Sequence, residues 1–276
     1  MNVETEKKTF RGRAIDLSGG SVAPEDIVAA VRSGTETGGI SIICGDPGPV
    51  HKYIGCIESG MSIRPRPALA AAARSLGVNA PQDEEIEHIE ERMYSLDIGD
   101  VSLRPERRRV ADASGSETRL REQVAALRGR VQALREVEGD FDSAESDLQR
   151  MTRELAELET KRIAAEQTLE AARKRQQAAR NAREQRLRLR DRKENLERSA
   201  RRHLVRRIHE RFDSAIKAVP GRGRTTDPGT FEGDPVTAAL AIARVARVRA
   251  PIVLACDRFD TSKSAAECLD APVLQV

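Results

Sequence analysis

Tryptophan is absent from this chain of 276 residues, and aromatic side chains of all kinds make up only 3% of it. Charged residues, by contrast, make up 33%. A chain of this composition has too few large apolar groups to bury most of its length in a globular core. We therefore expect much of it to lie on exposed helical surface, in an elongated part of the molecule.

Long apolar runs and cysteine motifs are also lacking. No run approaches the roughly 18 to 20 apolar residues that span a bilayer, which excludes an integral membrane protein and a membrane partner. The chain opens "MNVETEKKTFRGR" without a secretory segment, so we expect a reduced, cytoplasmic compartment. His203 and His209 fall on different faces of a helix, and no cysteine pair has zinc spacing. The sequence predicts no metal and no cofactor, and buried, reduced thiols at Cys44, Cys56, Cys256 and Cys268.

Strand and helix patterns occupy the two ends of the chain. The N-terminal elements are a strand at 9–17, a helix at 24–33, a strand at 40–44, a strand or helix opening at 50–57, and helices at 66–77 and 81–96. The C-terminal elements are a helix at 235–248, a strand at 251–257, a helix at 262–269 and a strand at 272–276. Strands alternating with helices predict a mainly parallel sheet. A tail this short rarely folds alone, so we expect a small split α/β head built from residues 1–98 and 236–276.

The middle of the chain predicts a long helical coiled-coil insertion. Apolar residues recur at intervals of seven from 120 to 155, with Val124 and Val131 between them, which is the spacing of a coiled-coil seam. We place linkers at 99–116 and 220–235 and the coiled coil at 117–219. Turn residues at 136–147 favour a helical hairpin that turns there, and a fold-back near Asn181 is the alternative. The seam residues at the seven-residue spacing are Leu120, Leu127, Leu134, Phe141, Leu148 and Leu155.

The stretch "GDPGPVHK" after the strand at 40–44 invites comparison with a phosphate-binding loop. Such a loop needs G-x-x-x-x-G-K-S/T, and starting from Gly45 the chain has Val, His and Lys at the last three defined places. "IICGD" and "LACD" are alike, and if their strands lie parallel in one sheet their carboxyl ends share an edge. Asp46, His51, Lys52 and Asp257 then form a candidate ligand site with acid–base potential. The alternative is a structural turn with strand-end caps, and we predict no catalytic residue.

"PIVLACD" resembles the strand that ends in a magnesium-organising Asp in P-loop ATPases, and "LSGG" spells part of the transporter-type signature. The layout resembles the structural-maintenance-of-chromosomes group, in which a coiled coil separates two halves of an ATPase head. In this chain Asp257 is followed by Arg258, where that group carries a catalytic Glu, and "LSGG" precedes the loop. The resemblance implies, as an alternative function, a degenerate coiled-coil ATPase.

The most informative charged feature is the stretch from 173 to 211, which holds 16 Lys/Arg and 5 Asp/Glu, a net charge of +11. Charge of this density attracts nucleic acid by counterion release. Residues 117–172 have a net charge of −4, and a hairpin is expected to lay part of them against the basic stretch, which leaves a net charge near +7. No aromatics interleave to stack on bases. A solvated coiled-coil surface is the alternative to polyanion binding, for which the candidate residues are Arg173, Lys174, Arg180, Arg183, Arg201, Arg202, Arg206 and Arg207.

"GDPGPVHKYIGCI", "RPALAAAARSLG" and the ending "RAPIVLACDRF…LDAPVLQV" resemble a group of uncharacterised haloarchaeal proteins with an α/β segment at each end and a charged helical middle. That resemblance implies no activity. We therefore expect a cytoplasmic, non-catalytic coiled-coil interaction or scaffold protein. Its expected partners are itself or another coiled-coil protein, with DNA or another polyanion as an additional partner.

Overall fold

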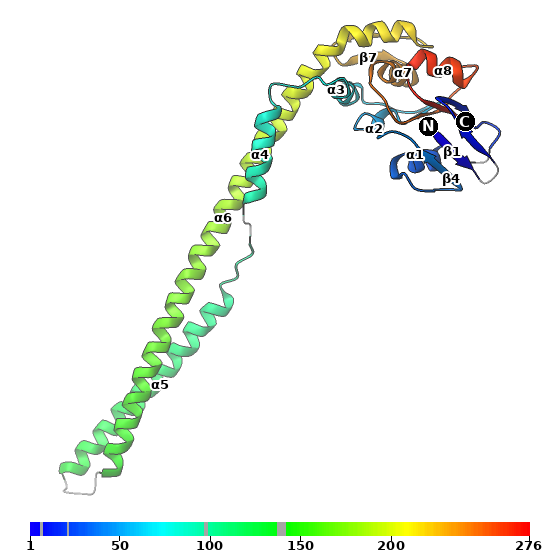
Figure 1. The fold of residues 1–276 in the computed structure, drawn as a ribbon. Coiled ribbons are helices and arrows are strands. Elements are labelled where there is room, and N and C mark those ends of the chain that lie inside the picture. Colours follow the sequence, from blue (N-terminus) through cyan, green and yellow to red (C-terminus); the bar gives the residue numbers. More distant parts are fainter. Residues whose placement is uncertain (6–7, 21, 97–98, 137–141) are drawn as a thin grey trace. The chain divides into compact units, whose positions relative to one another are not determined.

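The computed structural model describes residues 1–276 apart from 6–7, 21, 97–98 and 137–141. It divides into two compact units. Unit 1 contains Met1–Ile89 and Lys193–Val276, and unit 2 contains Glu90–Arg192. Both ends of the chain therefore belong to one unit, whose ribbon is shown in Figure 1.

A parallel sheet in unit 1 joins the two ends of the chain. Its strands, in spatial order, are β3 (Ala14–Asp16), β9 (Val273–Gln275), β8 (Ile252–Ala255) and β5 (Cys56–Glu58). Every neighbouring pair is parallel, with Ile15 opposite Leu274 and Ile57 opposite Leu254. Because N-terminal strands flank the C-terminal ones on both sides, neither segment completes the sheet alone. The predicted split α/β head is confirmed.

In the described part of the chain, five helices contribute buried residues to the core that also includes strands of this sheet. They are α2 (His51–Ile54), α3 (Pro65–Ser75), α7 (Pro235–Val245), α8 (Ser262–Leu269) and the last turns of α6 (Asp142–Ala218). A helix that is apolar on all sides is normally buried, and α7, "PVTAALAIARV", follows that rule with residues 238–243 fully buried. Its start is fixed by Asp234, whose side chain accepts a hydrogen bond from the Val236 amide. The core extends from α7 onto α6 through Leu204, Ile208 and Phe212.

A second, antiparallel sheet in unit 1 corrects two predictions. Its spatial order is β2 (Thr9–Arg11), β1 (Asn2–Thr5) and β4 (Ile40–Ile43), with α1 (Pro24–Ser33) packed on it. The predicted strand at 9–17 is two strands in two different sheets, because the chain breaks at Gly12, where φ is +155°. The prediction that "IICGD" lies beside "LACD" is also wrong. β4 pairs with β1, a polar strand that the sequence pattern did not reveal, and β5 takes the place beside β8.

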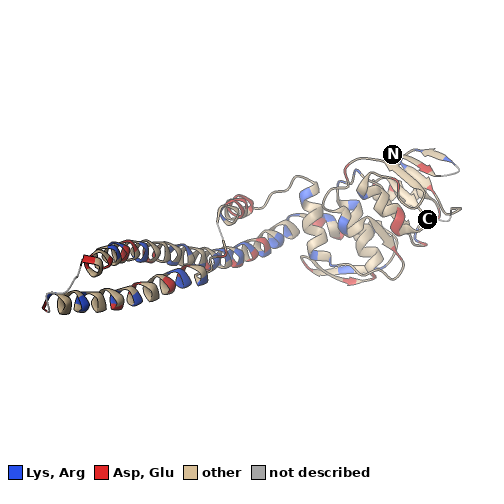
Figure 2. Ribbon diagram, turned by 90° about the horizontal axis from the view of Figure 1, so that it is seen from below, with Lys and Arg blue, Asp and Glu red and all other residues tan. Residues whose placement is uncertain are grey.

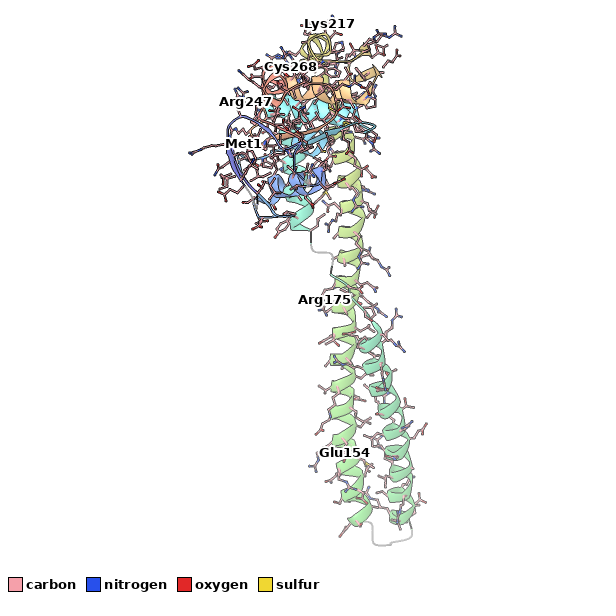
Figure 3. The ribbon with its side chains drawn as sticks, turned by 90° about the vertical axis from the view of Figure 1, so that its right-hand side faces the viewer. Met1, Glu154, Arg175, Lys217, Arg247 and Cys268 are labelled. Carbon is pink, nitrogen blue, oxygen red and sulfur yellow. The ribbon has the colours of Figure 1, made fainter. Side chains whose placement is uncertain are left out.

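Unit 2 is a helical hairpin. Helix α5 (Arg104–Glu136) packs against α6 and buries Leu120, Val124 and Val131 of the predicted seam. Figure 3 labels Glu154, within the paired part of α6, and Arg175, beyond the start of α5. The predicted hairpin is thus confirmed, and a fold-back near Asn181 is excluded because α6 is continuous there. The turn itself, with Gly139 and Phe141, lies outside the described residues.

The predicted linkers are partly structured. α5 begins at Arg104, so only the first residues of the predicted linker at 99–116 precede the helix. Gly115 lies within the helix in open space, where its missing side chain removes no contact. The linker predicted at 220–235 contains a two-stranded hairpin, β6 (Gly223–Asp227) and β7 (Thr230–Gly233). Helix α4 (Asp83–Ser95) matches the predicted acidic helix.

Glu117 occupies a seam position of the hairpin, seven residues before Val124, although it is a carboxylate. Only 4% of its side chain is exposed. Its oxygens meet Arg121 of the same helix at 2.6 Å and Arg162 of α6 at 2.6 Å. A buried polar residue in a coiled-coil seam fixes the register of the two helices, because any slip would leave the charge unpaired.

Candidate polyanion-binding surface

The loop that resembles a phosphate-binding site is built around a structural histidine. His51 is 1% exposed, and its Nε2 lies 3.0 Å from the carbonyl oxygen of Pro251. A carbonyl only accepts, so we assign the proton to Nε2. Burial lowers the pKa of His51 below its ordinary value, and the nearby Arg32 adds to this, whereas the bond to Pro251 opposes it. A neutral imidazole here ties α2 to the entry of β8.

The other members of the candidate ligand set do not join His51. Asp46 is exposed, and its Oδ1 accepts a hydrogen bond from the Gly48 amide at 3.2 Å, which is the geometry of a turn. Asp257 is exposed beyond the carboxyl end of β8, whereas His51 contacts the residue before the strand begins. His51 and Asp257 therefore lie at opposite ends of β8, whose four residues span about 10 Å at about 3.3 Å per residue. Lys52 is exposed on α2.

The same geometry bears on the resemblance to coiled-coil ATPases. A phosphate loop and a strand-end Asp act on one nucleotide when their strands end at the same edge of one sheet. The loop after β4 leaves the antiparallel sheet, and Asp257 follows a strand of the parallel sheet. Asp257 and the loop at 45–52 therefore do not share a sheet edge.

The thiols have the environment of packing groups. Burial raises the pKa of Cys56 to about 11, with nearby carboxylates contributing, and burial also raises the pKa of Cys256 and Cys44. A raised pKa keeps a thiol protonated and unreactive at neutral pH. All four cysteines are free. No cluster of three or more His, Cys, Asp or Glu side chains suited to a metal occurs among the described residues.

The predicted basic residues, by contrast, are all exposed on α6. Arg173 lies 3.8 Å from Glu170, and Arg183 lies 3.4 Å from Asp100. The remaining six form no ion pair within the part of the chain that the structure describes. They are Lys174, Arg180, Arg201, Arg202, Arg206 and Arg207. Figure 2 shows Lys and Arg interleaved with Asp and Glu where α5 and α6 run together.

The hairpin does not place the acidic residues of 117–172 against the basic stretch at 173–211. Leu103, next to the start of α5, packs against Leu169 and Ala172 of α6. Further along, Arg121 of α5 meets Glu159 at 3.0 Å. Helix α5 is therefore paired with residues 142–172 of α6, and the acidic residues of that stretch do not lie against residues 173–211. The prediction that part of the stretch at 117–172 covers the basic stretch is wrong.

Within unit 1, part of this surface forms a hollow of about 840 Å³. One wall is α6, and the opposite wall contains the start of α3 and the tip of the β6–β7 hairpin. No carboxylate and no aromatic ring is among the described residues that line it. Its five arginines are Arg66, Arg198, Arg201, Arg202 and Arg206. We call this feature the arginine hollow.

The helical period places these arginines on one face. On α6, Leu204, Ile208 and Phe212 are buried in the core. Residues three and four apart share a helix face, so Arg198, Arg202 and Arg206 form a stripe away from that core face. The sequence prediction named three of the five arginines and missed Arg198 and Arg66. The spacing of four would have revealed Arg198, but only the fold brings Arg66 to the site. Arg207, which was predicted, does not line the hollow.

The β6–β7 tip positions the outer wall. Arg66 donates a hydrogen bond from Nη2 to Oγ1 of Thr230 at 3.2 Å. Gly229 has φ +83°, and a Cβ there would lie 2.6 Å from Cγ of Arg66 and 3.0 Å from Cγ1 of Val205. Only glycine combines this backbone conformation with so close an approach. The turn thus lies close to both the Arg66 stem and Val205, the apolar floor of the hollow.

The arginines on α6 are held by local polar groups. Arg202 donates to Oγ of Ser199 at 3.2 Å, and Arg206 donates to the carbonyl oxygen of Arg202 at 3.4 Å. Arg198 donates to Oδ1 of Asn195 at 2.6 Å. A guanidinium carries five N–H donors, so each retains donors for a ligand. Their planar fork matches the oxygens of a phosphate.

Comparison with known protein families matches residues 12–273 to DUF7856, described as a family of unknown function. No curated protein is similar to the chain. The matched segment includes β3, β5 and β8 of the parallel sheet, the whole helical hairpin, and all five arginines of the hollow. The chain belongs to the DUF7856 family, a family of unknown function.

Proposed function

We propose that this chain is a cytoplasmic, non-catalytic coiled-coil protein that binds the phosphate backbone of nucleic acid, most directly duplex DNA, through residues 173–211 of α6. The binding is independent of sequence. It draws its free energy from the counterions that arginine and lysine release from the backbone. No helix in the described part of the chain is long and apolar enough to cross a membrane.

One observation carries this proposal: the eight candidate cations of α6 are exposed, and most of them have no carboxylate partner among the described residues. Six of the eight candidate cations form no ion pair among the described residues, and the acidic part of the hairpin pairs with α5 instead. A cation that is already paired would have to exchange one anion for another on binding. An unpaired cation contributes its full charge to a polyanion.

The geometry supports contacts to phosphate more than contacts to bases. Side chains that read bases enter a groove or stack on aromatic rings. The basic stretch offers no stacking surface, because residues 173–211 hold no aromatic side chain. Affinity should therefore depend on charge and salt, with little dependence on sequence.

Fluorescence anisotropy with two labelled duplexes of equal length, one rich in A·T and one rich in G·C, tests the proposal. We expect both to bind the full-length chain with similar Kd, and both duplexes to remain intact after incubation with magnesium. No binding at about 50 mM salt, where electrostatic binding is strong, would contradict the proposal. A large preference for one duplex would contradict sequence-independent binding.

A role as a scaffold arm is a second candidate, favoured by the length of the two helices, 33 residues in α5 and 77 in α6. The seam is buried within one chain, so a partner helix would contact the outer face of the hairpin. Exposed apolar residues there include Ile163, which is 48% exposed. Light scattering separates the two partners expected from the sequence. A dimer mass supports self-association, and a mass of 30.4 kDa leaves another helical protein as the partner.

A further inference from the structure

We propose that the arginine hollow of unit 1 is a built binding site for a linear chain of phosphates. This inference rests on the proposed function and locates the phosphate binding in the arginine hollow. The ligand class is a run of consecutive phosphates, as in the backbone of a nucleic-acid strand or in inorganic polyphosphate. The hollow binds the phosphates themselves and makes no contact that distinguishes one base from another.

The charge of the hollow supports a ligand with several phosphates. Five guanidinium groups line it, and no carboxylate does so among the described residues. Arg198 and Arg206 are eight residues apart on α6, which corresponds to about 12 Å along the helix. One strand of duplex DNA carries one phosphate per about 3.4 Å of the helix axis, so a stretch of this length presents about four consecutive phosphates. A ligand with a single phosphate would leave most of the guanidinium groups unmatched.

The walls of the hollow add geometry to this charge. Arg66 comes from α3, whereas the other four arginines come from α6, so cations line both sides. Val205, 3% exposed, forms an apolar floor between them. The volume of about 840 Å³ lies within the range of about 300 to 1,000 Å³ that is usual for ligand sites. A phosphate chain between the two walls meets donors from both.

The composition of the lining determines what is recognised. Proteins that bind single strands through their bases stack them on aromatic side chains. The described residues that line the hollow include none, and the uncharged polar ones are Asn195 and Ser199. Both already accept a hydrogen bond from an arginine, Arg198 and Arg202 respectively. Recognition therefore falls to the guanidinium groups, which match phosphate oxygens in pairs.

The test compares two triple variants that remove the same charge. Arg201→Ala/Arg202→Ala/Arg206→Ala removes three of the four arginines that α6 contributes to the hollow. Arg107→Ala/Arg108→Ala/Arg109→Ala removes three exposed arginines from α5, outside the hollow. If all five arginines contact phosphate, the affinity of the wild type for duplex DNA falls about 500-fold between 50 and 200 mM salt. The hollow variant keeps two contacts, so over the same salt range we expect its affinity to fall only about 12-fold. The affinity of the α5 variant should fall as steeply as that of the wild type.

A charge-conserving variant serves as a control for loss of the folded structure. Arg201→Lys/Arg202→Lys/Arg206→Lys keeps the charge and loses the planar fork, so we expect an affinity between those of the wild type and the alanine variant. Thermal unfolding of each variant shows whether unit 1 is intact. If wild type binds DNA but the hollow and α5 variants weaken it equally, the hollow is not the site, while the proposed function stands. If the wild type binds no DNA, the proposed function fails first.

Competition identifies the ligand class and its source. Inorganic polyphosphate with as many phosphates as one strand of the labelled duplex should displace the duplex from the protein. An uncharged nucleoside should not displace it. Tighter competition by polyphosphate points to polyphosphate as the source of the phosphate chain, and tighter competition by unlabelled DNA points to nucleic acid. Failure of polyphosphate to compete, or competition by the nucleoside, would overturn the inference that phosphates alone are recognised.

Discussion

Replacing Phe212 by alanine tests whether the end of α6 is an integral part of the head. Phe212 is fully buried in the core of unit 1, beside Leu204 and Ile208 of the same helix. Its ring lies 6.2 Å from the ring of Phe231 in β7, with the two planes inclined at 56°. The substitution removes this contact and leaves a cavity between α6 and the β6–β7 hairpin.

The cost follows from burial. Truncating a buried phenylalanine to alanine lowers the free energy of unfolding by about 3 to 5 kcal/mol. For a domain of the size of unit 1, each kcal/mol lowers Tm by about 2 to 4 °C, so we expect a decrease of roughly 6 to 20 °C. Phe212→Leu, which leaves a smaller cavity, should fall between the wild type and Phe212→Ala.

Tyrosine fluorescence is a suitable probe of this unit. The chain has no tryptophan and two tyrosines. Tyr53 packs against the core of unit 1, whereas Tyr94 is 94% exposed and its surroundings should change little on unfolding. Leu187→Ala, on the same helix but 57% exposed, is the matched control and should change the free energy of unfolding by less than about 0.5 kcal/mol. A loss below about 1 kcal/mol for Phe212→Ala would refute the packing of α6 into the head.

Two further predictions concern the turn at the hollow and the buried histidine. Gly229→Ala should lower stability more than Gly60→Ala. The two glycines have similar φ values of +83° and +81°, which costs alanine about 1 to 2 kcal/mol, but only Gly229 has Arg66 and Val205 in the way. Equal losses in urea unfolding would show that the turn does not press on Arg66. Burial lowers the pKa of His51 in the folded state below the 6.5 of the unfolded state. Below pH 6.5 the unfolded state therefore takes up a proton that the folded state does not, and the free energy of unfolding decreases. His51→Gln keeps a donor near Nε2 but does not titrate. The difference in Tm between the wild type and this variant should shrink as pH falls from 7 to 5. A constant difference would contradict the claim that His51 is buried and neutral in the folded state.

The helical hairpin and the split head could be predicted because their signals are local. The seven-residue spacing of Leu120 and Leu127 is present in the sequence itself, and so is the alternation of helix and strand in the C-terminal tail. Two short terminal segments that each lack a core must combine, so the shared sheet followed from length alone. The start of α5 at Arg104 was missed because Pro105, Gly115 and several serines have the composition of a linker, although a proline in the first turn suits a helix.

The pairing of strands could not be predicted with the same certainty. Two N-terminal segments, "ISII" and "CIE", are both apolar enough to lie beside β8, and the choice depends on β1, which occupies the edge of β4. Strand pairing is a contact between distant residues, and no local pattern encodes it. The candidate site at Asp46 and Asp257 depended on that pairing and is not assembled.

The arginine hollow combines residues that a local sequence pattern predicts with one that only a contact between distant parts of the chain brings to the site. Arg202 and Arg206 are four residues apart on α6 and could be predicted to share a face. Arg66 lies 135 positions before Arg201 in the chain, and only the fold, which brings the start of α3 and the β6–β7 turn close to α6, places it in the hollow. Counting charges along the helix also overestimated how far the acidic part of the hairpin covers the basic part, because that estimate requires the length of α5.

The salt dependence of DNA binding by the full-length wild-type chain tests the central claim most directly. The logarithm of the association constant is plotted against the logarithm of salt concentration, and the slope counts the phosphates that the protein neutralises. Contact by the five arginines of the hollow predicts a slope of about −4.5, and additional contacts along α6 make it steeper. A slope shallower than about −1, or no binding at low salt, would contradict the claim that this surface binds a phosphate backbone.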